Sequence, residues 1–164
     1  MTELPSSFFY TENTMDLILW RHADAQDGDN DMARALTAKG QKQAEKMALW
    51  IRENLPEKTR ILVSPAVRAL QTADALGLDY EVIANIAPGA MGERILSAAG
   101  WPDARGSVLL VGHQPTLGEA ASLLLFGETR GLNIKKGGLV WLTNRVRGSH
   151  PQTILKAAMS PEML

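Results

Sequence analysis

Two histidines and two arginines in this sequence could carry out phosphoryl-transfer chemistry. Arg21 and His22 directly follow one apolar run, His113 follows another, and Arg68 lies shortly after a third. The guanidinium group of arginine is a rigid fork of donors that suits phosphate oxygens. One histidine can serve as a nucleophile and the other as a charged donor to the same phosphoryl group. Each residue alone could equally be an ordinary surface residue. The functional interpretation therefore depends on whether the predicted strands and helices bring the four side chains together.

Three short apolar runs are predicted to position these side chains. Leu17–Trp20, Ile61–Val63 and Ser107–Val111 have strand length and, apart from Ser107, are apolar throughout, which is typical of strands buried on both faces of a parallel sheet. The carboxyl ends of parallel strands meet at one edge, where open α/β sheets bind their ligands. We therefore expect both histidines and both arginines to converge at this edge.

Helix-start signals follow two of these strands. Ser64 and Pro65 are residue types favoured at the cap and at the first position of a helix, which puts Arg68 in the first turn. A cation there opposes the helix macrodipole, so Arg68 favours an anionic ligand. Thr116 and Glu119 match a capping box that opens an apolar helix.

The other elements complete an alternating pattern. Predicted helices span residues 37–54 and 92–99, and predicted strands span residues 80–86, 139–145 and 154–158. The last two strands are expected to form an antiparallel edge. The pattern predicts an α/β fold, with a mostly parallel central sheet flanked by helices in one compact domain. We place this domain at residues 15–164, after an N-terminal extension of residues 1–14.

Composition limits the possible partners. The chain has 164 residues, and its 17 basic and 18 acidic side chains give a net charge of −1, which supports neither nucleic-acid nor membrane-surface binding. No apolar run reaches the ~18–20 residues of a membrane span, and no signal peptide is predicted. There is no cysteine, which excludes a thiolate nucleophile and thiolate metal sites and fits a cytoplasmic location.

The sequence does not predict a metal site. Two histidines without a carboxylate or cysteine partner make a poor zinc set, and neighbouring arginines repel a cation. The run Asp27–Asp31 imitates the start of a calcium loop, but Met32 stands where that loop needs glycine and Ala38 where it needs a bidentate glutamate. We interpret this run as a solvated loop at the mouth of the site.

Four segments resemble the motifs of the histidine phosphatase superfamily, which also contains the phosphoglycerate mutases. The resemblance implies a phosphoglycerate mutase-like fold and a phosphatase that needs no cofactor. Because the chain is short and has no large helical insertion, it is most similar to the small phosphohistidine phosphatases of this superfamily. The matching segments are Arg21–Asp24, Arg34–Gly40 with Gln43–Ala44, Ser64–Thr72 and Gly112–Pro115.

The resemblance also implies a role for each site residue. His22 corresponds to the nucleophile that forms a phosphohistidine enzyme intermediate, and Arg21 and Arg68 correspond to the phosphate clamp. His113 corresponds to the second pocket histidine. The implied partner is a phosphorylated protein carrying phosphohistidine, or a small phosphorylated substrate, and we expect a monomer.

Two departures from the family pattern bear on the substrate. Ala23 replaces the usual glycine after the nucleophile, which adds a methyl group near the pocket. The segment Ala87–Glu93 also has no acid directly at the strand end, where relatives that cleave phosphate esters carry a proton donor. An imidazole leaving group needs such a donor less than an alkoxide does. We therefore favour phosphohistidine as the substrate, with Glu93 and Asp24 as the residues that could still donate a proton.

Two other functions stay open at this stage. One is a phosphatase for a small phosphate ester or phosphoserine. The other, of a different class, is a non-catalytic module that binds phosphate or a partner. The third histidine, His150, falls in a predicted turn and is interpreted as solvated.

Overall fold

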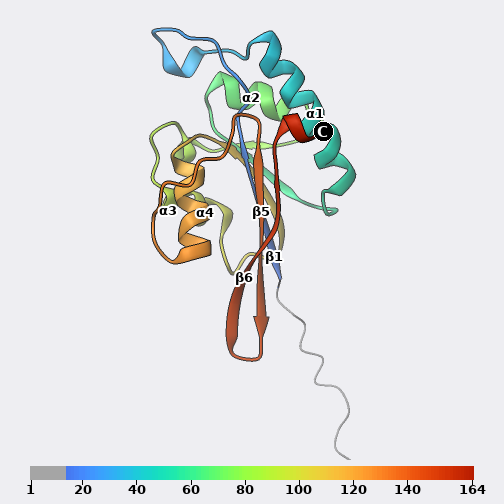
Figure 1. The fold of residues 1–164 in the computed structure, drawn as a ribbon, viewed down its shortest axis with the longest axis vertical. Coiled ribbons are helices and arrows are strands. Elements are labelled where there is room, and N and C mark those ends of the chain that lie inside the picture. The colour runs from blue at the N-terminus through green and yellow to red at the C-terminus, as the bar shows by residue number, and fades with distance from the viewer. Residues whose placement is uncertain (1–13) are drawn as a thin grey trace, which may run out of the picture.

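The computed structural model describes residues 14–164 and contains a six-stranded sheet with helices on both faces (Figure 1). The strand order is β3-β2-β4-β1-β5-β6. The proposed extension, residues 1–14, lies outside the described residues except for Thr14. The strands are β1 (Met15–Arg21), β2 (Arg60–Val63), β3 (Glu81–Val82), β4 (Gly106–Gly112), β5 (Leu139–Arg147) and β6 (His150–Met159).

The predicted α/β class is confirmed. Strands β3, β2, β4 and β1 are parallel, and β5 pairs antiparallel with both β1 and β6. None of the helices in residues 14–164 is long and apolar enough to cross a membrane. The helices are α1 (Ala38–Asn54), α2 (Val67–Asp74), α3 (Gly92–Ala99) and α4 (Thr116–Phe126), with short 3₁₀ turns η1 (Asp31–Ala33), η2 (Ala84–Ile86) and η3 (Pro161–Met163).

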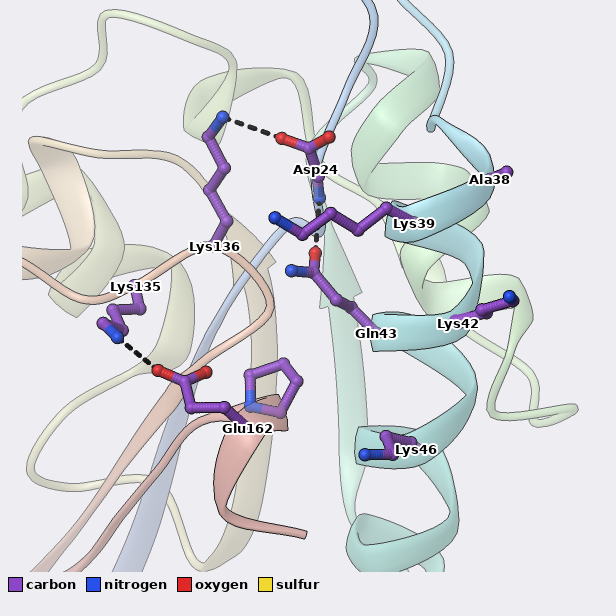
Figure 2. Close-up of a pocket in the computed structure, with 10 residues that line it drawn as sticks. Asp24, Ala38, Lys39, Lys42, Gln43, Lys46, Lys135, Lys136 and Glu162 are labelled. Atoms are coloured by element: carbon purple, nitrogen blue, oxygen red, sulfur yellow. Dashed lines mark hydrogen bonds and ion pairs between the residues drawn. The ribbon is translucent and has the colours of Figure 1, made fainter.

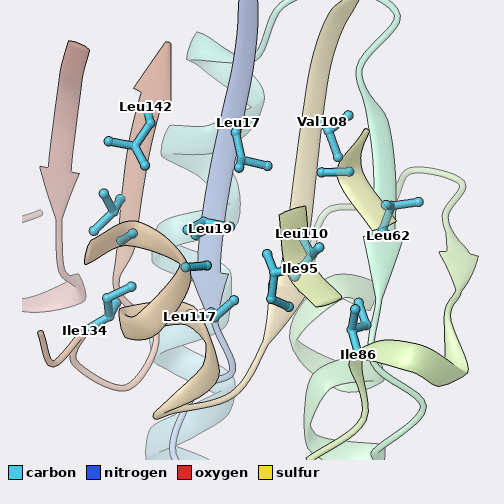
Figure 3. Packing of buried hydrophobic residues seen from close by; sticks show 14 of the residues in the cluster. Leu17, Leu19, Leu62, Ile86, Ile95, Val108, Leu110, Leu117, Ile134 and Leu142 are labelled. Atoms are coloured by element: carbon cyan, nitrogen blue, oxygen red, sulfur yellow. The ribbon is translucent and has the colours of Figure 1, made fainter. Parts of the chain in front are cut away.

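Strand β1 is buried on both faces, as its apolar run predicts. Leu17 and Leu19 pack with residues of α3 and α4, including Leu117 of α4 (Figure 3). Ile18 and Trp20 point to the opposite face, into a cluster with residues of α1 and α2. Burial of alternate side chains on two layers fixes the register of β1, because a shift by one residue would exchange its two faces. The end of β1, which leads into the site, is therefore rigidly placed.

Three local predictions are wrong, two of them because the expected capping side chains bond to distant residues. Helix α2 begins at Val67, and its N-terminus has no side-chain cap, because the Ser64 hydroxyl bonds elsewhere. Helix α4 has no capping box: Thr116 Oγ1 donates to the carbonyl of Ala90. The Glu119 carboxylate instead accepts from the first N–H of α3. The predicted strand at residues 80–86 shortens to β3 followed by η2.

The start of α1 packs directly on the loop after β1, and this contact requires glycine. Thr37 caps α1 as predicted, accepting from the N–H of Gly40 at 2.9 Å. A Cβ atom on Gly40 would lie 2.0 Å from the carbonyl oxygen of Asp24, which forces the backbones apart. Gly40→Ala should therefore lower the free energy of unfolding by about 3 kcal/mol. Urea denaturation checks this, with Gly131→Ala as the control because a Cβ there meets nothing within 4 Å.

Candidate active site

The four residues singled out in the sequence line one pocket of about 300 Å³ at the carboxyl edge of the parallel strands. Arg21 ends β1, His22 follows it, Arg68 lies in the first turn of α2, and His113 follows β4. We call this cavity the His22 pocket. The rings of His22 and His113 lie 5.2 Å apart, centroid to centroid. The remaining lining residues are Ala25, Asp31, Arg34, Pro88, Gln114 and Lys136.

Hydrogen bonds fix the tautomer of His22. Its Nδ1 lies 2.7 Å from the carbonyl oxygen of Ala23, which can only accept, so Nδ1 carries the proton. The other ring nitrogen, Nε2, accepts from Nε–H of Arg68 at 3.4 Å. Both contacts leave the lone pair of Nε2 directed at the arginine that would hold a phosphoryl group. A nucleophilic imidazole requires this arrangement.

Burial keeps His22 neutral. Its exposed fraction is 7%, and loss of hydration lowers its pKa from 6.5 to about 4. The bond to Ala23 opposes this shift, and the positive charges of Arg68 and Arg21 reinforce it. The neutral, nucleophilic form therefore persists well below neutral pH.

The titration of His22 can be followed by NMR of its ring protons. We expect the midpoint near pH 4, because burial and the arginines disfavour the imidazolium. The spectrum of His22→Gln, which lacks the signal, provides the assignment. A midpoint near the ordinary 6.5 would contradict the burial argument.

The two arginines are held by different partners. Arg21 Nη1 donates to the carbonyl of Ile134 at 2.7 Å. Arg68 is 3% exposed, and its guanidinium donates to the Asp31 backbone carbonyl at 2.6 Å and to the Asp31 carboxylate at 3.1 Å. These bonds orient both guanidiniums at the pocket before any ligand arrives, which reduces the entropy lost on binding.

Ser64 orients the second histidine. Its hydroxyl lies 2.6 Å from Nε2 of His113 and accepts from the N–H of Ala66 at 3.3 Å. Among residues 14–164, Nε2 of His113 is the acceptor within reach of this hydroxyl proton, so we infer that the proton of His113 sits on Nδ1. That nitrogen is buried and has no partner within the described chain. Burial first, and then the repulsion that a protonated His22 would exert on a second imidazolium, lowers the pKa of His113 to about 3, so its Nδ1–H is a neutral donor rather than the charged one expected from sequence.

Removing the Ser64 hydroxyl should impair turnover without removing a pocket charge. Ser64→Ala frees His113 to adopt the other tautomer, and we expect kcat to fall about tenfold to a hundredfold. KM should change little, because both arginines remain. Steady-state kinetics check this against Ser122→Ala, a fully buried serine of α4 outside the pocket. An equal loss in both variants would mean that the effect is general packing.

The carboxylates near the pocket are poor proton donors. Asp24 is not among the lining residues of the His22 pocket, and hydrogen bonds from Lys136 and Thr37 hold its pKa below the ordinary value. Glu93 is exposed on α3 and does not line the pocket. Asp31 is the one carboxylate among the lining residues, and Arg34 and Arg68 hold its pKa low as well.

Three charged lining residues of the pocket have no role predicted from the sequence: Lys136, Arg34 and Asp31. In the sequence, Arg34 belongs only to a family motif, and Asp31 only to a predicted solvated loop. The structure joins them, because the Arg34 guanidinium donates to the Asp31 carboxylate at 3.0 Å and 3.1 Å. The acidic composition of this loop gave no sign that one of its carboxylates would pair with Arg68.

The methyl group of Ala23 does not intrude on the pocket. Ala23 is fully buried in a small cluster with Leu36 and Ala44, and its N–H donates to Thr72 Oγ1 at 3.0 Å. The methyl group that alanine adds therefore packs in this buried cluster, next to His22, and leaves the pocket open. His150 is exposed at the start of β6, as its turn position predicted.

Comparison with known proteins places this site in a family. The profile described as histidine phosphatase superfamily (branch 1) matches residues 17–94, which include Arg21, His22 and Arg68. The phosphohistidine phosphatase SixA of Escherichia coli (strain K12) is 34% identical over 126 residues, covering 70% of this chain and 77% of SixA. An uncharacterised protein of Picosynechococcus sp. is 36% identical over 166 residues, covering 92% of this chain and 99% of the relative.

The fold is similar as well. A solved structure of the protein histidine phosphatase SixA complexed with tungstate superposes with a TM-score of 0.75 at 26% identity, covering 91% of this chain and 99% of the other. The similarity extends over nearly the whole described domain. The resemblance inferred from short motifs is therefore confirmed at the level of sequence and of fold.

Proposed function

This chain belongs to the histidine phosphatase superfamily, and we propose that it removes phosphoryl groups from phosphohistidine in proteins through a covalent intermediate on His22. The observation that carries the proposal is the pocket itself. It combines a neutral imidazole whose unprotonated Nε2 faces Arg68 and two oriented arginines with a single lining carboxylate among residues 14–164, Asp31, which Arg34 and Arg68 keep ionised.

The first step is attack by His22 on phosphorus. The lone pair of Nε2 forms the new N–P bond while the bond from phosphorus to the substrate imidazole breaks. Arg21 and Arg68 hold the equatorial oxygens, and Nδ1–H of His113 donates to one of them. In the second step water attacks the phosphoenzyme, which releases inorganic phosphate and restores neutral His22.

The leaving group is what favours phosphohistidine. Once its second ring nitrogen has taken a proton from solvent, the phosphohistidine ring departs as neutral imidazole, a weakly basic leaving group whose conjugate acid has a pKa of about 6.5. An alkoxide is far more basic and requires a general acid. All three candidate acids, Asp24, Asp31 and Glu93, are ionised by their partners or lie outside the pocket.

The names of the relatives support the same substrate. SixA of Escherichia coli is named a phosphohistidine phosphatase, and the solved SixA structure holds tungstate, a tetrahedral oxyanion like phosphate. The cytoplasmic location, the monomeric state and independence from a cofactor stay predictions from the sequence.

A substrate comparison tests the proposal. Three peptides of one sequence are prepared with phosphohistidine, phosphoserine or phosphotyrosine at the central position, and phosphate release is measured at neutral pH. We expect kcat/KM for phosphohistidine to exceed both others by at least about a hundredfold, since only its leaving group needs no acid. A preference for phosphoserine would favour the ester phosphatase instead. Phosphate binding without turnover of any peptide would favour the non-catalytic module.

A further inference from the structure

A basic groove of about 910 Å³ opens beside the His22 pocket (Figure 2). Five of the seven lysines in the chain line it, although the net charge of the chain is −1. We call this feature the lysine groove. Lys39, Lys42 and Lys46 come from α1, and Lys135 and Lys136 come from the segment before β5 on the other side.

The positive charge of the groove is only partly neutralised. Two carboxylates line it, and each binds one lysine: Asp24 binds Lys136 at 2.8 Å, and Glu162 binds Lys135. Lys39 and Lys42 are exposed and have no hydrogen bond or ion pair to any residue in the described part of the chain. In Figure 2 the Lys39 side chain extends from α1 toward the opposite wall. Cationic charge therefore remains available to an external anion.

The lysine groove adjoins the His22 pocket. Lys136 lines both cavities, and Asp24, two residues after His22, lines the groove. A polypeptide whose phosphoryl group enters the His22 pocket would therefore lay its flanking residues over the lysines. The three α1 lysines span eight residues of helix, or roughly 10 Å along its axis, which matches several side chains of a partner better than one small anion.

We propose that the lysine groove binds an acidic stretch of the phosphorylated protein next to the phosphohistidine, an inference that rests on the proposed function. The lining residues favour carboxylates over nucleotides or polyphosphate. None of them is an arginine, whose fork binds phosphate in a bidentate manner, and none is aromatic, as base stacking requires. Hydrated lysines instead attract a solvated acidic surface and increase its capture rate.

Two phosphohistidine peptides test this inference. They differ only in their flanks, which carry four glutamates in one peptide and four glutamines in the other. Wild-type protein should hydrolyse the acidic peptide with a kcat/KM at least about tenfold higher at low salt, and high salt should reduce the ratio. Lys39→Glu/Lys42→Glu should bring the ratio to one or below.

The matched control places the same charge change at the opposite ends of the parallel strands, away from the lysine groove. Lys58→Glu/Arg105→Glu alters exposed residues that precede β2 and β4, at the amino ends of these strands. This variant should keep the preference for the acidic peptide. Equal kcat/KM for both peptides in wild type, or equal loss of preference in both variants, would overturn the groove assignment while phosphohistidine hydrolysis stands.

Two further outcomes separate the proposals. If neither phosphohistidine peptide is hydrolysed but a matched phosphoserine pair is, the proposed substrate is wrong, and the same charge comparison on the phosphoserine pair decides the groove. If inorganic tripolyphosphate inhibits wild type but not Lys39→Glu/Lys42→Glu, and neither peptide is preferred, the groove takes a small polyanion and the inference is overturned.

Discussion

His22→Ala should lower kcat for a phosphohistidine peptide by at least about ten-thousandfold. The Nε2 lone pair of the His22 imidazole faces the Arg68 guanidinium, whereas Nε2 of the other pocket imidazole, His113, is bonded to Ser64. Without His22, the covalent step has no attacking atom, and only direct attack by water remains. Binding of phosphate should survive, because Arg21 and Arg68 keep their own partners, the Ile134 carbonyl and Asp31.

His150→Ala is the matched control for this variant. It removes the same side chain from an exposed position at the turn between β5 and β6, and its kcat should equal that of wild type. Thermal unfolding of both variants verifies that the fold is intact. If folded His22→Ala keeps more than about one per cent of kcat, His22 is not the nucleophile.

Arg68→Ala should lower kcat by about a hundredfold to a thousandfold, which corresponds to about 3–4 kcal/mol of transition-state stabilisation. Arg68 is nearly fully buried and contacts the attacking nitrogen of His22. It can therefore bind the phosphoryl oxygens both before and after the group moves from the substrate to His22. Arg68→Lys should recover only part of the loss, because an ammonium group cannot donate in parallel to Asp31 and to the phosphoryl oxygens.

The control for Arg68 is Arg60→Ala. Arg60 lies at the opposite end of β2, exposed, in an ion pair with Glu81 at 3.2 Å. A surface pair of this kind contributes little, so both stability and kcat should stay close to wild type. If Arg68→Ala changes KM but leaves kcat intact, the guanidinium holds the substrate without stabilising the transition state.

The convergence of the site could be predicted from sequence because it depends on strand topology. Three buried runs, each followed by a histidine or shortly by an arginine, determine which edge the side chains reach, and local periodicity is enough to find the runs. The start of α1 was also predictable, since the Thr37 cap bonds to Gly40 within the same turn. Sequence patterns predicted a feature correctly where the residues that form it are close together in the chain.

Predictions failed where a side chain is used by a distant residue. Ser64 has the residue type of a helix cap, but its hydroxyl binds His113, 49 positions away. Glu119 has the residue type of a capping box, but it serves the start of α3. Likewise, the spacing of Lys39, Lys42 and Lys46 is visible in the sequence, whereas only the fold brings Lys135 and Lys136 opposite them.

Trapping the phosphoenzyme tests the central claim most directly. Wild-type protein is mixed with a phosphohistidine peptide carrying a radiolabelled phosphoryl group and quenched in alkali, where phosphohistidine survives and phosphate esters of serine and threonine do not. We predict one acid-labile label per active chain, located by mass spectrometry on Nε2 of His22 and missing from His22→Ala. A label on another residue, or turnover without any labelled protein under saturating substrate, would contradict the covalent mechanism.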